Sequence, residues 1–280
     1  MLKQRVVTAL VIAALFLACL FWLSPPLFSV VGAVVIVVGA WEWAYLAGLE
    51  RPRWRVLYAL LVMVLMAWLY FAVGFDSAAV NADRAGSVML AGGIWWALAL
   101  LWVQGYPSSA ILWGSVPVRL AMGLMVLIPA WVALSLLHAL GGGAWLVLMA
   151  VLVVAAADIG AYFTGRRFGR RKLAVAVSPG KTLEGLAGGL AAALLLAAIV
   201  SLVAPSLRPF WWQWTLIVLA SALASVLGDL LESMVKRHRG VKDSGRILPG
   251  HGGILDRIDS LSAALPFFAL LYLSLIPAGP

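Results

Sequence analysis

Long apolar runs, separated by short polar or charged segments, repeat along almost the whole sequence. A helix needs about 20 mainly apolar residues to span the hydrocarbon core of a bilayer. The runs that reach this length predict nine spans, at about 6–24, 27–48, 54–74, 88–105, 119–139, 144–164, 186–204, 213–232 and 260–278. Because unpaired backbone polar groups are not tolerated in hydrocarbon, each span is expected to be an α-helix. The segment 106–118 is expected to be a loop or an interfacial piece.

Composition supports an all-α, polytopic membrane protein. Of the 280 residues, 64% are hydrophobic and only 11% are charged, whereas a soluble domain is typically about 25% charged. The 14 tryptophans suit the membrane interfaces, where an apolar ring with one polar N–H group is favourable. The single cysteine, Cys19, excludes a disulfide within the chain, and a cysteine-based metal site is not expected.

The distribution of Lys and Arg predicts how these spans are oriented. The net charge of +9 is interpreted first as an orientation signal and not as a sign of nucleic-acid binding. With the N-terminus in the cytoplasm, all basic residues except Arg84 and Arg208 fall in cytoplasmic segments. No small-x-small cleavage site follows the first run, so it is expected to be a retained helix. The expected location is the inner (cytoplasmic) membrane, with the active site on the cytoplasmic side.

The acidic residues divide the chain into two parts. Those of residues 1–150 are Glu42, Glu50, Asp76 and Asp83, and every other acid lies between positions 158 and 259. Residues 1–140 are therefore predicted to form a scaffold of transmembrane helices. Residues 141–280 are predicted to form the catalytic part, with cytoplasmic loops at 165–185 and 233–258.

Mixed charge is densest between positions 228 and 260, beside apolar runs. Four polar residues there follow the spacing i, i+3, i+4, i+7, namely Asp229, Glu232, Ser233 and Lys236. This spacing places side chains on one face of a helix. Acids at the end of a span are costly in lipid, so they are expected to face the protein interior or a water-filled cavity. The alternative is an ion pair with Arg237 or Arg239 at the membrane surface.

A glycine-rich turn, Pro249-Gly250-His251-Gly252-Gly253, follows the basic loop and precedes Asp256 and Asp259. Glycines let backbone N–H groups approach a ligand, and a helix N-terminus favours anions. Carboxylates that collect Mg²⁺ beside Lys and Arg are what phosphoryl chemistry requires. Helix capping is the alternative for the two aspartates, but it does not account for the histidine, the glycines and the basic run together.

The segment from Ser233 to Asp259, SMVKRHRGVKDSGRILPGHGGILDRID, resembles the signature of the phosphatidate cytidylyltransferase (CDP-diacylglycerol synthase) family. The segments 158–162, 165–169 and 178–185 resemble further motifs of that family, and the N-terminal half resembles it only as a set of apolar helices. The resemblance implies transfer of CMP from CTP to phosphatidic acid, giving CDP-diacylglycerol and pyrophosphate in phospholipid biosynthesis. It also implies Mg²⁺, a second cation, a membrane-lipid environment and a homodimer.

The resemblance implies roles for individual residues as well. Asp229 and Asp256 are expected to be metal ligands and catalytic residues, and Asp259 is expected to be a further catalytic carboxylate. The expected substrate contacts are Ser178, Lys181, Thr182, Glu184, Lys236, Arg237, Lys242, His251 and Arg257. For the basic residues, the alternative is a role in topology or in binding lipid headgroups only.

Gly180-Lys181-Thr182 resembles part of a P-loop, but the Walker pattern needs a glycine where this chain has Val175. It also needs a preceding strand, and a membrane helix and a basic loop are expected here instead. A P-loop is therefore not expected. The family usually has lysine where this chain has Gly180. Asp158 and Glu42 lie inside predicted spans, and both functional and structural roles stay open for them. The spacing of Gly185 and Gly189 permits close helix packing.

Two other classes of function remain as alternatives. An ion-coupled transporter would be expected to place its acids nearer the middle of the bilayer and to show a repeated half. A CTP-dependent polyprenol kinase would share the nucleotide and the membrane, but it would transfer the terminal phosphoryl group. The full signature favours the cytidylyltransferase.

Overall fold

The computed structural model describes residues 2–77, 80–204, 210–248, 250 and 252–276, with side chains from residue 6 onward. Within these ranges, each predicted span corresponds to one long helix. These helices are α1 (Leu2–Trp22), α2 (Pro25–Ala47), α3 (Pro52–Val73), α4 (Ala82–Gln104), α6 (Val116–Ala139), α7 (Gly143–Phe168), α8 (Leu183–Val203), α9 (Trp211–His238) and α10 (Leu255–Leu275). The segment predicted to be a loop or an interfacial piece contains the short helix α5 (Ala110–Trp113).

The helices have the length and surface of a polytopic membrane protein. Among the described residues, 8 helices are long and apolar enough to cross a membrane, and α1 adds the shorter apolar stretch Val6–Trp22. Large apolar side chains such as Trp22, Phe71 and Leu202 are exposed on the outside. Such a surface is unfavourable in water and suits lipid. The predicted all-α, polytopic class is therefore confirmed.

Proline and glycine set several of the helix boundaries. Proline occupies the first turn of α2, α3 and α6, where its missing N–H would have no partner within the helix. Gly48 ends α2 and Gly74 ends α3, with φ values of 108° and 84° that glycine adopts without steric cost. The apolar runs therefore end where the sequence contains the residues that stop a helix.

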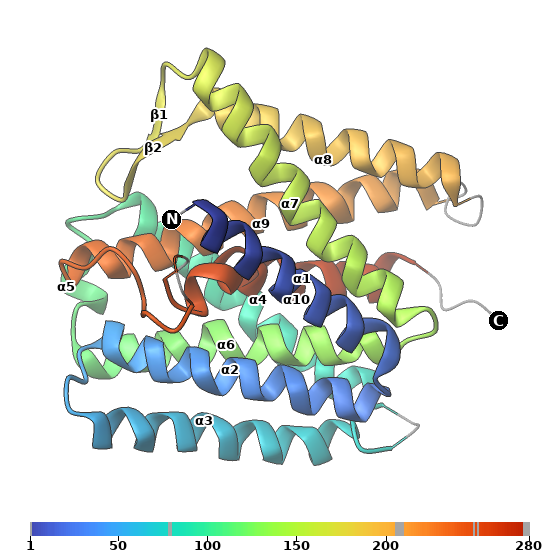
Figure 1. Cartoon of the computed structure of the whole chain (residues 1–280), viewed down its shortest axis with the longest axis horizontal. Coiled ribbons are helices and arrows are strands. Elements are labelled where there is room, and N and C mark those ends of the chain that lie inside the picture. Colours follow the sequence, from blue (N-terminus) through green and yellow to red (C-terminus); the bar gives the residue numbers. More distant parts are fainter. Residues whose placement is uncertain (1, 78–79, 205–209, 249, 251, 277–280) are drawn as a thin grey trace.

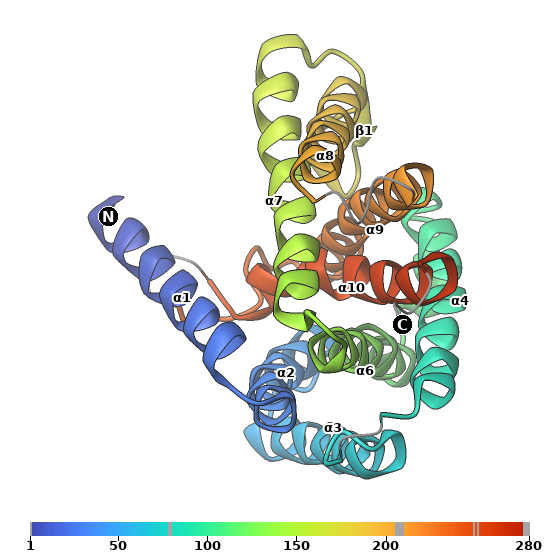
Figure 2. The same ribbon diagram turned by 90° about the vertical axis from the view of Figure 1, so that its right-hand side faces the viewer.

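α9 and α10 lie between two groups of helices (Figure 2). The helices α2, α3, α4 and α6 form one group, and the pair α7 and α8 forms the other. α10 packs on α9, α6 and α4, so the last helix of the predicted catalytic part lies against the predicted scaffold. α1 stands to one side and makes few contacts, mainly with α2 and α7.

Small residues let α7 and α8 pack closely. A methyl group added at Gly160 would lie 2.6 Å from the backbone oxygen of Gly188. One added at Gly189 would lie 2.6 Å from the backbone oxygen of Ala157, and one at Gly185 would lie 3.0 Å from that of Ala161. The close packing expected from the spacing of Gly185 and Gly189 is confirmed.

An antiparallel hairpin, β1 (Lys172–Ala174) and β2 (Ser178–Thr182), joins α7 to α8. The sequence predicts only a loop here, because strands of 3 and 5 residues are too short for a clear alternating pattern. The expectation that no strand precedes the GKT triplet is therefore wrong. The triplet nevertheless lies inside β2 and does not form a phosphate-binding loop between strand and helix, so the rejection of a P-loop stands.

The hairpin, α5 and the segment between α9 and α10 lie at the same end of the molecule (Figure 1). α9 extends to His238, beyond the predicted end at 232, so Lys236 and Arg237 lie on the helix. α10 begins at Leu255 instead of 260, so Asp256 and Asp259 lie in its first turns. Both extensions place charged residues of the segment 233–259 on helices, so helix geometry sets the directions of their side chains.

Candidate active site

One face of α9 carries the polar residues that its spacing predicts. The Oγ of Ser233 donates a hydrogen bond to Oδ1 of Asp229 at 3.0 Å. One turn further on, the Nζ of Lys236 lies 3.0 Å from Oε1 of Glu232. Arg239, proposed as an alternative partner for these acids, pairs instead with Glu50 at 3.6 Å. The shared face is therefore confirmed.

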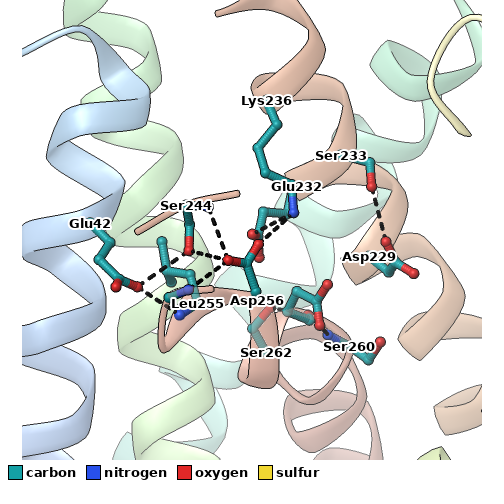
Figure 3. Close-up of polar contacts among 12 residues, drawn as sticks. Glu42, Asp229, Glu232, Ser233, Lys236, Ser244, Leu255, Asp256, Ser260 and Ser262 are labelled. Atoms are coloured by element: carbon teal, nitrogen blue, oxygen red, sulfur yellow. Dashed lines mark hydrogen bonds and ion pairs between the residues drawn. The ribbon is translucent and has the colours of Figure 1, made fainter. Parts of the chain in front are cut away.

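Lys236 connects α9 to α10 (Figure 3). Its Nζ lies 2.7 Å from Oδ1 of Asp256 as well as 3.0 Å from Glu232. The side chains are 12% exposed for Lys236, 9% for Asp256 and 3% for Glu232. Buried charges are tolerated only when they are paired. The one ammonium group of Lys236 is therefore shared between two buried carboxyl groups from two helices.

The other oxygen of Asp256 is held by the turn that precedes α10. Its Oδ2 accepts hydrogen bonds from the backbone N–H of Gly253 at 2.8 Å, and from the backbone N–H and the Oγ of Ser244 at 3.0 and 2.9 Å. Gly252 has φ +82°, and a methyl group there would lie 2.6 Å from this oxygen. Asp256 therefore holds the turn that precedes α10 and does not cap the first N–H groups of the helix, and its Oδ1 is directed toward Lys236.

Glu42 on α2 also reaches this segment, although its role was left open. Its Oε2 accepts hydrogen bonds from the backbone N–H of Leu255 at 2.9 Å and from the Oγ of Ser244 at 3.3 Å (Figure 3). The sequence did carry a signal, which is an acid inside an apolar span. It did not reveal the partner, because Ser244 lies 202 positions further along the chain.

A second ion pair joins α9 to the hairpin. The Nζ of Lys181 on β2 lies 2.7 Å from Oδ2 of Asp229. The side chains are 26% and 32% exposed, so this pair is open to solvent. Asp158 on α7 interacts electrostatically with both residues, which places this intramembrane acid beside the same pair.

Asp259 lies deeper than Asp229, at the contact between α9 and α10. Its Oδ1 accepts a hydrogen bond from the backbone N–H of Ser260 at 2.7 Å. A methyl group at Gly228 would collide with the backbone oxygen of Asp259, so the two helices touch here. The side chains of Asp259, Glu232 and Trp96 help to line a small internal cavity. Asp259 therefore lies next to the buried cluster.

Two of the predicted substrate contacts have local partners. Thr182 is buried, and its Oγ1 accepts a hydrogen bond from the backbone N–H of Gly185 at 3.1 Å, which caps α8. Glu184 accepts hydrogen bonds from the backbone N–H groups of Arg170 at 3.0 Å and Arg171 at 3.1 Å. These bonds fix the turn from α7 into β1, beside an open pocket of about 340 Å³. A contact of either residue with substrate stays a prediction.

The remaining predicted contacts are spread around this end of the molecule. Arg237 donates a hydrogen bond from its Nε to the backbone oxygen of Val177 at 3.4 Å, which ties α9 to the hairpin. Lys242 and Arg257 are exposed. Ser178 begins β2. His251 and the outer-side Arg208 lie outside the described residues.

The carboxylates suit a cation that also binds substrate. Within the described ranges, no group of three His, Cys, Asp or Glu side chains is placed to hold a metal ion by itself. Mg²⁺ usually binds one or two carboxylates and completes its shell with water and substrate phosphates. The ammonium group of Lys181 lies beside Asp229 and that of Lys236 beside Asp256, in positions that a metal cation could take. Asp229 is the more accessible of the two carboxylates, since its side chain is 32% exposed and that of Asp256 is 9% exposed.

Comparison with known proteins bears on the whole chain. The model of the cytidylyltransferase family matches residues 3–275. The chain is 46% identical to the phosphatidate cytidylyltransferase of Pseudomonas aeruginosa, over 97% of both proteins. It is 42% identical to the protein of the same name from Haemophilus influenzae, over 97% of this chain and 99% of that protein. A Bacillus subtilis protein of that name is 52% identical over 122 residues, which cover 44% of this chain and 45% of the relative.

Proposed function

This chain belongs to the cytidylyltransferase family, and we propose that it is a phosphatidate cytidylyltransferase acting in phospholipid biosynthesis. The reaction joins CTP and phosphatidic acid to give CDP-diacylglycerol and pyrophosphate. The structural observation that carries the proposal is a set of two lysine–carboxylate pairs, Lys236–Asp256 and Lys181–Asp229, each with one member on α9. Carboxylates that can hold a cation, beside ammonium groups at one end of a membrane bundle, suit a reaction between two polyanions.

The proposed reaction is a substitution at phosphorus. An oxygen of the lipid phosphate attacks the α-phosphorus of CTP and forms a new P–O bond. The bond from the α-phosphorus to the oxygen that bridges the α- and β-phosphates breaks, and its electron pair leaves with pyrophosphate. The attacking phosphate is already ionised near pH 7, so no strong general base is needed. The main barrier is the repulsion between the two substrates, which positive groups reduce.

Asp229 and Asp256 are the residues proposed to hold Mg²⁺, which would neutralise phosphate oxygens. When substrate binds, Lys181 exchanges Asp229 for a phosphate oxygen, which its partial exposure allows. Glu232 would remain a partner of Lys236 if Asp256 held the cation, because both carboxyl groups already contact its ammonium group. Arg257 and Lys242 are exposed next to this site and supply further positive charge to phosphates.

The proposed location of the site is the cytoplasmic side of the inner membrane. The positive-inside rule places short loops rich in Lys and Arg in the cytoplasm. The hairpin and the segment between α9 and α10 are such loops, and they lie at the same end of the bundle. CTP then arrives from the cytosol and phosphatidic acid from the bilayer. The second cation and the homodimer expected from the family resemblance stay predictions.

Label transfer tests the proposed function. Purified protein is incubated with phosphatidic acid in detergent micelles, Mg²⁺ and CTP labelled at the α-phosphorus, with a parallel reaction labelled at the γ-phosphorus. The α-label should enter a lipid product, and the γ-label should enter pyrophosphate. Reactions without phosphatidic acid provide the background. Absence of α-label from lipid contradicts the proposal, and lipid labelled only from the γ-position identifies a kinase instead.

A further inference from the structure

Glu42 lies where three segments that are distant in the sequence meet. It belongs to α2, it contacts the loop at Ser244, and it contacts the first residue of α10. Both hydrogen bonds end on the same oxygen, Oε2, at 3.3 Å from the Oγ of Ser244 and 2.9 Å from the N of Leu255. Glu42 and Ser244 are each 1% exposed, so water does not compete for these bonds.

The backbone of the loop closes around this carboxylate. A methyl group at Gly253 would lie 2.5 Å from both carboxylate oxygens of Glu42, and one at Gly245 would collide with Oε1. Only glycine allows such an approach. The loop therefore cannot move away from its position without breaking a packed contact with α2.

The hydrogen bond from the N–H of Leu255 to Glu42 satisfies a donor at the start of a helix. The first N–H groups of a helix have no partner within that helix. Leu255 is the first residue of α10, and its N–H is buried, so an acceptor from elsewhere is required. Glu42 supplies that acceptor from another helix and thereby fixes the start of α10.

Ser244 connects Glu42 to Asp256. Its Oγ lies 2.9 Å from Oδ2 of Asp256, and its backbone N–H donates to the same oxygen at 3.0 Å (Figure 3). A displacement of Ser244 would therefore rotate the carboxylate of Asp256 and change where its Oδ1 points. The two anchors of Glu42, Ser244 and Leu255, both contact or adjoin Asp256.

We propose that Glu42 is a positioning residue for the transfer reaction. It holds Ser244 and the start of α10, and so it fixes the direction in which Asp256 presents Oδ1 to Lys236 and to the cation. Glu42 does not contact substrate. The inference rests on the proposed function in one respect, which is the catalytic role of Asp256.

Kinetics separates this role from general packing. In Glu42→Ala, we expect kcat to fall about 10- to 100-fold, with a higher Mg²⁺ concentration for half-maximal activity, as for other residues that orient a metal ligand. Glu42→Gln should retain most of the activity, because an amide oxygen can accept both bonds made by Oε2. Glu50→Gln is the matched control, since this acid lies just after α2 and its side chain is 79% exposed; it should behave like wild type.

Hydrogen–deuterium exchange of the whole protein in detergent provides a measurement that needs no activity. The backbone amides of Ser244, Gly253 and Leu255 donate to Asp256 or Glu42. Peptides that cover residues 244–256 should lose protection in Glu42→Ala and keep it in Glu42→Gln and Glu50→Gln. Peptides from α7 and α8 should be unchanged in all three variants.

Several outcomes would overturn the inference. They are unchanged exchange in Glu42→Ala, an unchanged Mg²⁺ requirement in that variant, or a Glu42→Gln variant as impaired as Glu42→Ala. If Glu42→Ala does not fold, Glu42→Asp replaces it, because a side chain shorter by one methylene group cannot keep both bonds. If the wild type transfers no label, the proposed function fails, and the exchange comparison still decides whether Glu42 anchors the loop.

Discussion

Two lysine–carboxylate pairs each have one member on α9 and the same N–O distance of 2.7 Å, but their surroundings differ. Lys236 and Asp256, between α9 and α10, are 12% and 9% exposed, and each has further partners. Lys181 and Asp229, between the hairpin and α9, are 26% and 32% exposed. We call Lys236–Asp256 the closed pair, because it is buried and joins two helices. We call Lys181–Asp229 the open pair, because solvent reaches it and its members can exchange partners.

This difference predicts separate effects on folding and on reaction. Removing one partner of a buried ion pair leaves the other charge uncompensated, which costs about 3–5 kcal/mol. An exposed pair is typically worth about 0–1 kcal/mol, because water and salt replace the lost partner. Substitutions in the closed pair should therefore affect stability and activity together, and those in the open pair should affect activity alone.

The largest effect on the reaction is expected for Asp256→Asn. The amide is nearly isosteric, but it removes the negative charge that faces Lys236, so transfer should fall by at least about 100-fold. The assay is transfer of α-label from CTP to lipid, with membrane insertion verified by extraction and size-exclusion chromatography. Activity near that of wild type would mean that Asp256 serves only to hold the turn that precedes α10.

Lys236→Met should have the largest effect on stability. The substitution keeps an apolar stem but leaves Glu232 and Asp256 without their shared ammonium group, which should cost about 3–5 kcal/mol. Thermal unfolding in detergent measures the loss. A stability equal to that of wild type would show that the two carboxylates find other compensation, and the distinction between closed and open pairs would not hold.

Lys181→Met tests the open pair with the same change of side chain. We expect stability to change by less than about 1 kcal/mol, since water reaches Asp229. The KM for CTP should rise, because the lysine that exchanges its carboxylate for phosphate is gone. A loss of stability similar to that of Lys236→Met would remove the difference between the two pairs.

Thr182→Ala should have the smallest effect on the transfer reaction. It removes the hydroxyl that caps α8 at the end of the hairpin, at a cost of about 1 kcal/mol. Because Lys181 is the adjacent residue, the variant also asks whether the hairpin must be firmly anchored for CTP binding. An unchanged KM for CTP would limit Thr182 to capping, whereas a large rise would support the predicted contact with substrate.

Apolar run length and helical spacing are the signals in the sequence that predict most of the fold and one face of the site. Apolar run length is set by bilayer thickness, so every long helix was predicted, and helical spacing placed Asp229, Ser233 and Lys236 on one face. The β1–β2 hairpin was not predicted, because its strands are too short for a pattern. The contact of Glu42 with Ser244 depends on how α2 packs beside the loop, which residue order alone does not encode. The bonds of Glu184 to Arg170 and Arg171 likewise join residues 14 and 13 positions apart, whereas the cap formed by Thr182 is local and is the kind of signal that a sequence does carry.

The role of Asp229 as a metal ligand is tested most directly by changing the metal preference at this position. The protein has a single cysteine, so Asp229→Cys in a Cys19→Ser background places one thiol in the chain. Thiolates favour softer cations than carboxylates do. The Asp229→Cys variant should be inactive with Mg²⁺ and should recover α-label transfer to lipid with Cd²⁺, while Asp243→Cys in the same background should show no such recovery. A folded Asp229→Cys variant that stays active with Mg²⁺, or that no cation restores, would contradict the assignment of Asp229 as a metal ligand.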